Sequence, residues 1–294
     1  MVRQFDRRPT WREAAFLHEE IGQRMLERLR YIRLEPQAVL DAGCGGGWAR
    51  AGLAERYPHA HYQGHDVSAV ALAHARAGLG RPSAPRWWPR WGAARGGPAA
   101  PEWHQADLAA TGLPAESIDL IWSNLALHWH PAPPQVFTEW FRLLRPGGLV
   151  MFSTYGPATL HEVRQAVDDA GLATRLPSWI DMHDFGDMLL ENGFVDPVMD
   201  QETLTLTYPD ATSLLNDVRR LGGNPAHGRR AGLAGRSFRQ RLVQALEARR
   251  NPDGRLGLTI EVAYGHAWRG TARRHGNETH IPVSAITRRT DKPV

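Results

Sequence analysis

Apolar and polar positions recur with two different periods along this chain of 294 residues, and the changes of period mark its expected elements. Near the N-terminus, apolar positions repeat at helical spacing up to about Arg30, behind a capping-box pattern at residues 10–13. The apolar positions of this helix are Phe16, Leu17, Ile21, Met25 and Leu29. We therefore expect residues 1–35 to form an N-terminal helical segment.

Short runs further along predict the strands of a sheet. Four of them lie at 38–41, 61–66, 118–123 and 148–153, and another strand is expected after residue 101. Residues 203–208 and 256–264 alternate with period two, as strands near a sheet edge do. Because helical stretches separate the first strands, the order predicts an α/β, Rossmann-like fold. Its seven-stranded sheet would be mostly parallel, with an antiparallel edge strand and helices on both faces.

The main domain is expected to span residues 36–268 and to carry two insertions. Residues 78–101 are rich in Gly, Pro, Ala and Arg, which favours a surface loop, although interleaved Arg and Trp would also fit single-stranded nucleic acid. Residues 209–255 hold two amphipathic helices that would cover the carboxyl ends of the strands as a lid. Residues 269–294 lack periodicity and are expected to form a loose tail.

The strongest local signal is the glycine-rich turn at residues 41–47, between the first strand and a helix. Its glycines are Gly43, Gly45 and Gly47. They allow a ligand to approach the backbone closely, and the helix that follows directs its amides at the site. A dinucleotide fingerprint would require glycine where this chain has Trp48. The turn and its leading Asp41 instead resemble the first motif of class I S-adenosylmethionine-dependent methyltransferases.

This resemblance implies a site for S-adenosylmethionine, without a metal, at the carboxyl ends of the strands. Asp66 would accept both ribose hydroxyl groups. Asp107 occupies the place where this class contacts the adenine amino group. Residues 123–129 would run past the methionine and sulfonium part, where Ser123 and Asn124 offer polar groups. Trp122 or Trp129 could pack on apolar cofactor surface. The implied cofactor contacts are Asp41, Gly43, Gly45, Gly47, Asp66, Asp107, Leu108, Ser123 and Asn124.

Further segments resemble one family of this class, the malonyl-acyl-carrier-protein O-methyltransferases of biotin synthesis. They are the N-terminal helix, the 41–47 turn, and residues 123–129, 152–154, 160–164, 210–227 and 256–268. The resemblance covers most of the chain apart from the 78–101 insertion and the tail. The same segments also resemble a sister group, the mitochondrial complex I assembly factor reported as an arginine hydroxylase, to which residues 17–21 and 251–254 are similar.

The family resemblance implies methylation of the free carboxyl group of malonyl-acyl carrier protein. A carboxylate is already ionised at neutral pH, so positioning and desolvation would supply the catalysis without a general base. An arginine is expected to hold the malonyl group, and the candidates are Arg219 on the first lid helix and Arg164 on the helix after the fifth strand. His128 and Tyr155 are further candidates for lining the acyl site.

Cysteine content and the lack of long apolar runs narrow the cellular location expected for this chain. A single cysteine, Cys44, cannot form an intrachain disulfide and provides no zinc-type cluster. No apolar run approaches the roughly 18 residues of a membrane span. The first nine residues also lack the apolar core of a secretory signal. We therefore expect a cytoplasmic protein, and a monomer.

Charge is distributed unevenly along the chain. Residues 201–294 hold 16 basic and 8 acidic side chains, whereas the other 200 residues hold 19 basic and 23 acidic ones. This asymmetry indicates an anionic partner, which the family resemblance identifies as the acidic acyl carrier protein. The almost complete use of Arg in place of Lys, with Lys292 the one lysine, also fits genome composition alone.

Three other functions stay open at this point. One is an assembly factor or hydroxylase that uses the same cofactor pocket on a protein substrate. Another is a methyltransferase for a different small molecule or for nucleic acid. DNA is disfavoured because residues 123–126 do not match the Asn/Asp-Pro-Pro-aromatic motif of amino-methylating DNA enzymes. The third is a module that binds the cofactor without turnover.

Overall fold

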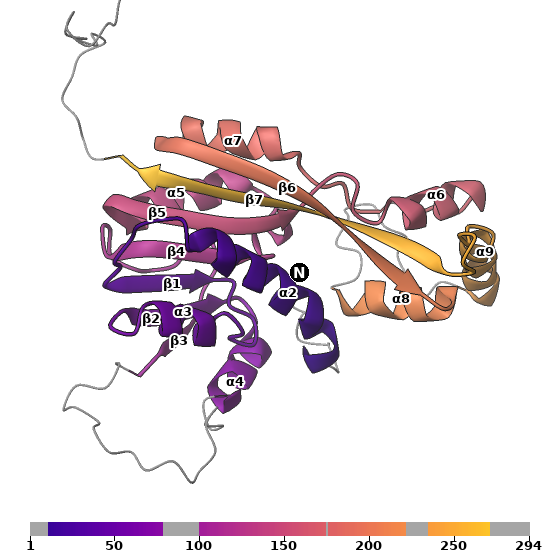
Figure 1. Ribbon diagram of the computed structural model, residues 1–294, viewed down its shortest axis with the longest axis horizontal. Helices are drawn as coiled ribbons and strands as arrows, with labels where there is room; N and C mark the ends of the chain where they lie inside the picture. Colours follow the sequence, from indigo (N-terminus) through magenta and orange to yellow (C-terminus); the bar gives the residue numbers. More distant parts are fainter. Residues whose placement is uncertain (1–10, 79–99, 175, 222–234, 271–294) are drawn as a thin grey trace, which may run out of the picture.

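The computed structural model of this chain describes residues 11–78, 100–174, 176–221 and 235–270. In this part of the chain seven strands form one sheet, in the order β3-β2-β1-β4-β5-β7-β6 (Figure 1). The strands are β1 (Ala38–Ala42), β2 (His61–Asp66), β3 (Glu102–Gln105), β4 (Ile118–Asn124), β5 (Leu144–Tyr155), β6 (Phe194–Tyr208) and β7 (Leu256–Arg269). The first five are parallel, and β7 is antiparallel to both β5 and β6. The predicted α/β fold with its reversed strand near one edge is confirmed.

Helices cover both faces of this sheet. The helical elements are α2 (Trp11–Leu29), α3 (Arg50–Arg56), α4 (Ala69–Gly78), the short 3-10 helix η1 (Leu127–Trp129), α5 (Pro133–Leu143), α6 (His161–Asp169), α7 (Met182–Glu191), α8 (Ala211–Arg220) and α9 (Arg236–Glu247). Alternate residues of each strand enter opposite cores, because side chains in a strand point to the two faces in turn. Leu40 and Val150 pack with α5 and α7, whereas Val39 and Met151 pack on the face that holds α2, α3 and α4.

Helix α2 lies across one face of the sheet (Figure 1). Leu17, Ile21, Met25 and Leu29 are buried, as the helical period predicted. Phe16 is 41% exposed, so the prediction that it belongs to the apolar face of this helix was wrong. Phe16 directly precedes Leu17, and neighbouring residues on a helix point in different directions, so both cannot face the core.

The edge strand β6 is much longer than the alternating run at 203–208 predicts. Its first part contains a register shift between Val195 and Val198, around Asp196 with a φ of 50°. A bulge of this kind interrupts the period of two and accommodates a proline, here Pro197. The alternation therefore becomes visible only beyond the bulge.

The two antiparallel strands β6 and β7 extend past the parallel part of the sheet. Their far end meets α6, α8 and α9, which gather at one end of the molecule (Figure 1). Asp210 caps α8 as predicted, because its carboxylate accepts a hydrogen bond from the Ser213 backbone N–H at 2.8 Å. Within the described residues, no helix combines the length and the apolar character needed to cross a membrane. Of the expected insertion at 78–101, residues 79–99 lie outside the described residues, and so do residues 271–294 of the expected tail at 269–294.

Candidate active site

The glycine turn after β1 is held tightly against its neighbours. The backbone N–H groups of Gly43 and Cys44 donate to the carbonyl of His65 at 2.8 and 2.9 Å. Gly43 has a φ of 80°, a left-handed conformation that favours glycine. A Cβ atom on Gly43 would also collide with the Cβ of Ala126, in the segment after β4. The turn is therefore closely packed on the residues that follow β4.

A cavity of about 200 Å³ opens beside this turn, at the carboxyl ends of β1, β2 and β4. Ligands bind at this edge in open α/β sheets. Of the predicted cofactor contacts, those that line the cavity are Asp41, Gly43, Gly45, Asp66, Asp107, Leu108 and Asn124. Gly47 and Ser123 are not part of its lining. Residues from four separate segments of the sequence thus meet around one hollow.

Two carboxylates stand at this cavity with their acceptor atoms partly engaged. One oxygen of Asp66 accepts from the Gly45 backbone N–H at 2.9 Å, and the other accepts from that of Ser68 at 2.8 Å. Asp107 accepts from the Ala109 backbone N–H at 2.8 Å and lies 3.3 Å from Nε2 of His130. Each carboxylate oxygen can accept more than one hydrogen bond, so both groups can also receive hydroxyl or amino donors of a ligand.

Asp41 is the buried acid of the site. Its side chain is 2% exposed and accepts a hydrogen bond of 2.5 Å from the Tyr62 hydroxyl. Burial raises the pKa of Asp41 to about 7, against the lowering effect of the Tyr62 hydrogen bond, and the nearby charge of Asp66 raises it further. Because that pKa lies near neutrality, a cationic ligand group beside Asp41 would draw it into its ionised form.

Ser123 and Asn124 hold the end of β4 to its surroundings. The Ser123 hydroxyl donates to the carbonyl of Ala42 at 2.8 Å and is fully buried. Asn124 donates from its amide nitrogen to the His18 carbonyl at 2.7 Å, and its amide oxygen accepts from the Ser153 hydroxyl at 2.8 Å. Asn124 therefore connects α2, β4 and β5 at the point where it lines the cavity.

Sequence reasoning missed several residues of the cavity wall. His18 on α2 lines the cavity, and its ring lies 5.5 Å from that of Trp48. His130, next to the predicted Trp129, also lines it. No local pattern could have revealed His18, because its place follows from how α2 crosses the end of β4. In the sequence, Trp48 only argues against a dinucleotide fingerprint, whereas in the structure it is part of the cavity wall.

The acyl-site candidates fall into two groups. His128 lies in η1, shortly after β4, and Tyr155 is the last residue of β5. The centres of their rings lie 4.4 Å apart. Trp179, which the sequence reasoning did not consider, packs on both rings at 5.2 and 5.5 Å. Trp179 also lies 6.4 Å from Trp129 of the cavity wall. These four rings form an aromatic cluster beside the cavity.

The two candidate arginines do not line the cavity. Arg164 on α6 donates to the carbonyls of Pro157, Thr159 and Pro177, each at 3.4 Å. Arg219 is exposed on α8. Arg164 is thus engaged with backbone acceptors, while Arg219 presents its side chain at the surface of the predicted lid.

The described residues contain no group of three or more His, Cys, Asp or Glu side chains arranged to hold a metal ion. Cys44 is buried next to Asp41 and Asp66, and burial together with their negative charges raises the pKa of its thiol.

Comparison with known proteins decides the family. Residues 40–152 match the family model described as a methyltransferase domain. A malonyl-acyl-carrier-protein O-methyltransferase of Gallionella capsiferriformans is 43% identical over 262 residues, covering 88% of this chain and 86% of the relative. One of Methylovorus is 42% identical over 273 residues, covering 92% and 88%. The chain belongs to the malonyl-acyl-carrier-protein O-methyltransferase family.

Solved structures agree on the fold of this methyltransferase family member. The YcgJ protein of Bacillus subtilis aligns with a TM-score of 0.55 at 16% identity, covering 87% of this chain and all of that one. A phosphoethanolamine N-methyltransferase of Haemonchus contortus, solved with S-adenosylmethionine, aligns with a TM-score of 0.54 at 15% identity, covering 92% and 60%. These likenesses establish a class I methyltransferase fold around the cavity.

Proposed function

We propose that this chain transfers a methyl group from S-adenosylmethionine to the free carboxyl group of malonyl-acyl carrier protein. The product would be the methyl ester used in the synthesis of the biotin precursor. The observation that carries the proposal is the cavity beside the 41–47 turn, in a chain of this family. Asp66 lines this cavity from the end of β2, and Asp107 lines it from the segment just after β3.

Each part of the cofactor has a candidate partner in the cavity. Asp66 would accept the ribose hydroxyl groups, and Asp107 the adenine amino group. Asp41 and the glycine turn would face the methionine part, where the cofactor carries its own ammonium group. A carboxylate whose pKa is near 7 suits that place, because a neighbouring positive charge stabilises its ionised form.

The reaction requires little acid–base chemistry from the protein. A malonyl carboxylate oxygen would attack the methyl carbon in line with the sulfur, so that an oxygen–carbon bond forms as the carbon–sulfur bond breaks. The cofactor supplies the electrophilic methyl group and leaves as S-adenosylhomocysteine. What the protein adds is alignment and exclusion of water, for which the aromatic cluster of His128, Trp129, Tyr155 and Trp179 is well placed.

Arg219 is our first candidate for holding the acyl group. It is exposed on α8, and a guanidinium group binds a carboxylate or a thioester carbonyl well. Arg164 is the second candidate. Its guanidinium group donates hydrogen bonds to backbone carbonyls and would have to break them to bind a substrate. His128 and Tyr155 would line the path of the acyl group between them.

The carrier protein would dock near α8 and α9. Arg219, Arg236 and Arg239 are exposed on these two helices. An acidic carrier protein would be attracted to this end of the molecule, and the attraction would weaken with added salt. We further propose that the protein works as a cytoplasmic monomer on this soluble partner.

Methyl transfer from labelled S-adenosylmethionine tests the proposal directly. Malonyl-acyl carrier protein is the acceptor, and acetyl-acyl carrier protein, which lacks the free carboxyl group, is the matched control. We expect label on the malonyl form alone. No label from protein that binds S-adenosylhomocysteine would contradict this acceptor and favour the hydroxylase or assembly-factor function of the sister group.

A further inference from the structure

Helix α2 forms one wall of the cofactor cavity. His18 lines the cavity, and its backbone carbonyl accepts from the Asn124 side chain at 2.7 Å. One turn further along, a Cβ atom on Gly22 would lie 3.1 Å from the Asn124 amide nitrogen. The helix is therefore in close contact with the end of β4. A shift of α2 along its axis would move His18 and change the cavity wall.

The apolar face of α2 does not by itself fix this position. Leu17, Ile21, Met25 and Leu29 are all buried, and they account for the attachment of the helix to the core. Burial of apolar surface is non-directional, so it favours contact without selecting one axial register. Directional contacts define where His18 lies, and the Asn124 hydrogen bond is one of them.

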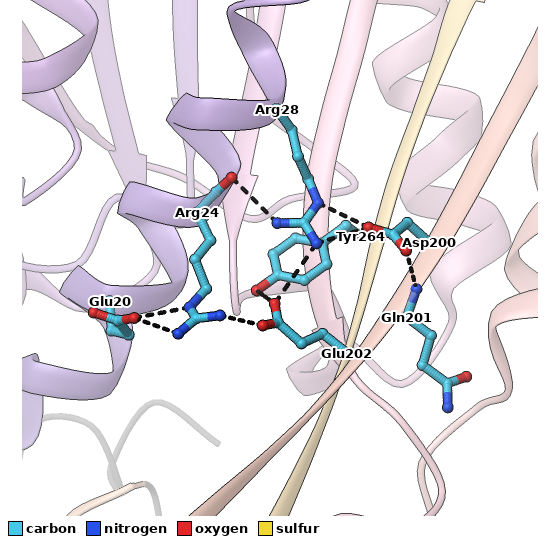
Figure 2. Close-up of polar contacts among 7 residues, drawn as sticks. All are labelled: Glu20, Arg24, Arg28, Asp200, Gln201, Glu202 and Tyr264. Carbon is cyan, nitrogen blue, oxygen red and sulfur yellow. Dashed lines mark hydrogen bonds and ion pairs between the residues drawn. The ribbon is translucent and has the colours of Figure 1, made fainter.

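Two half-buried arginines that flank the apolar face of α2, Arg24 and Arg28, provide further contacts of this kind (Figure 2). Arg28 forms hydrogen bonds with Asp200 on β6 at 2.7 and 2.9 Å and lies 3.6 Å from Glu202. Arg24 pairs with Glu202 on the same strand and with Glu20 on its own helix. The helix and the strand are thus joined at two points by charged groups.

The spacing of these groups matches on the two elements. Residues four apart on a helix are about 6 Å apart along its axis. Residues two apart on a strand are separated by about 6.7 Å and point to the same face. Arg24 and Arg28 therefore meet Glu202 and Asp200 in a single register, with the helix running opposite to β6. A displacement by one turn would leave one arginine without its carboxylate.

Tyr264 on β7 completes the arrangement, which we call the α2 clamp: Arg24, Arg28, Asp200, Glu202 and Tyr264. The Arg28 guanidinium lies 3.8 Å from the centre of the Tyr264 ring, and the Tyr264 hydroxyl donates to Glu202 at 3.4 Å. Asp200 and Tyr264 are paired directly across β6 and β7. Stacking and hydrogen bonding together orient Arg28 in a way that charge alone would not.

We propose that Arg24 and Arg28 are positioning residues for cofactor binding, acting through α2 on His18. The clamp holds α2 in the register at which His18 closes the cavity wall. The inference rests on the proposed binding of S-adenosylmethionine, and it assigns a role to residues that do not themselves line the cavity.

Charge reversal and its rescue test this role. Arg28→Glu places three acids together, whereas Arg28→Glu combined with Asp200→Arg restores an ion pair in the same register. Titration with S-adenosylhomocysteine gives the Kd, and thermal unfolding of the same samples reports folding. We expect Arg28→Glu to weaken binding about tenfold and the double variant to recover most of it, since each partly exposed pair has a modest effect of its own.

Matched variants separate positioning from stability. Arg145→Met removes a comparable pair, with Asp119 at 2.8 Å, at the other end of the sheet, and should leave the Kd unchanged. Arg28→Met serves if Arg28→Glu does not fold. Loss of thermal stability with an unchanged Kd, or a double variant as weak as the single one, would overturn the inference alone. Wild-type protein that binds no S-adenosylhomocysteine would contradict the proposed function, and the inference with it.

Discussion

At the scale of single residues, the site depends on backbone conformations that few side chains allow. The turn at 41–47 was predictable because glycine spacing reports these conformations directly. Gly43 in addition leaves the space that Ala126 occupies. His18 was not predictable, because nothing in its sequence neighbourhood reports the distant Asn124 that it meets. A local backbone conformation can therefore be predicted from the sequence more readily than a contact between distant segments.

Gly43→Ala should impair both folding and cofactor binding. Gly112→Ala is the matched control, because Gly112 has a similar φ of 74° with open space where a Cβ would lie. The control should lose about 1–2 kcal/mol of unfolding free energy from backbone strain alone. Gly43→Ala should lose more and bind S-adenosylhomocysteine weakly, as urea unfolding and titration would reveal. Equal behaviour of the two variants would contradict the close packing of the turn.

Asp41 should make stability depend on pH with a defined sign. In the folded state its carboxyl group keeps its proton up to about pH 7, whereas in the unfolded chain it ionises near its ordinary pKa of 3.8. Unfolding then releases a proton between these values, so this group destabilises the fold as the pH rises from about 4 to about 7.

Asp41→Asn removes this dependence. Its unfolding free energy minus that of the wild type should increase across the same pH window and level off above it, by at most about 4 kcal/mol. Urea unfolding at a series of pH values measures the difference. His65 has its pKa lowered by burial to about 4 and acts in the opposite direction, but it is present in both proteins and cancels. A difference that does not change with pH would refute the raised pKa.

At the scale of elements, helix α8 was predicted more fully than the strand before it. Asp210 and the apolar spacing of Leu214 identified α8, since capping and helical period are local signals. The start of β6 was hidden by the bulge at residues 195–198. Helices α5 and α7 were not assigned, although their apolar faces are clear once Phe137 and Phe185 are seen in the core.

Arg219→Ala should raise the KM for malonyl-acyl carrier protein about tenfold, because a charge-assisted contact with the acyl group is lost. The Kd for S-adenosylhomocysteine should stay as in the wild type. Arg220→Ala is the control, since Arg220 is on the same helix and pairs with Asp217 at 3.0 Å. Similar kinetics for both variants would mean that Arg219 has no special part in acyl binding.

At the scale of the whole molecule, charge is separated between two regions. Residues 201–294 carry 16 basic and 8 acidic side chains, and the exposed arginines of α8 and α9 belong to this part. The cavity beside the 41–47 turn is lined by Asp41, Asp66 and Asp107 instead. The sequence alone revealed this asymmetry, but it could not place the exposed arginines of α8 and α9 at the far end of β6 and β7, because that depends on where these two strands carry their helices.

Salt should therefore affect the two substrates differently. Raising NaCl from about 0.05 to 0.3 M should increase the KM for malonyl-acyl carrier protein several-fold, because screening weakens long-range attraction between exposed charges. The Kd for S-adenosylhomocysteine should change little. The double variant Arg236→Ala with Arg239→Ala should flatten the salt dependence of KM. A KM that is independent of salt in the wild type would refute electrostatic docking at α8 and α9.

The α2 clamp joins the earliest part of the described chain to the last strand of the sheet. During synthesis, α2 leaves the ribosome long before Asp200 and Tyr264 exist. The apolar face of α2 belongs to the same core as the β7 residues Ile260 and Val262, which are synthesised much later. Contacts of such sequence separation slow folding and leave apolar surface open to aggregation. We therefore expect the core around α2 to be completed only after β7 has been made.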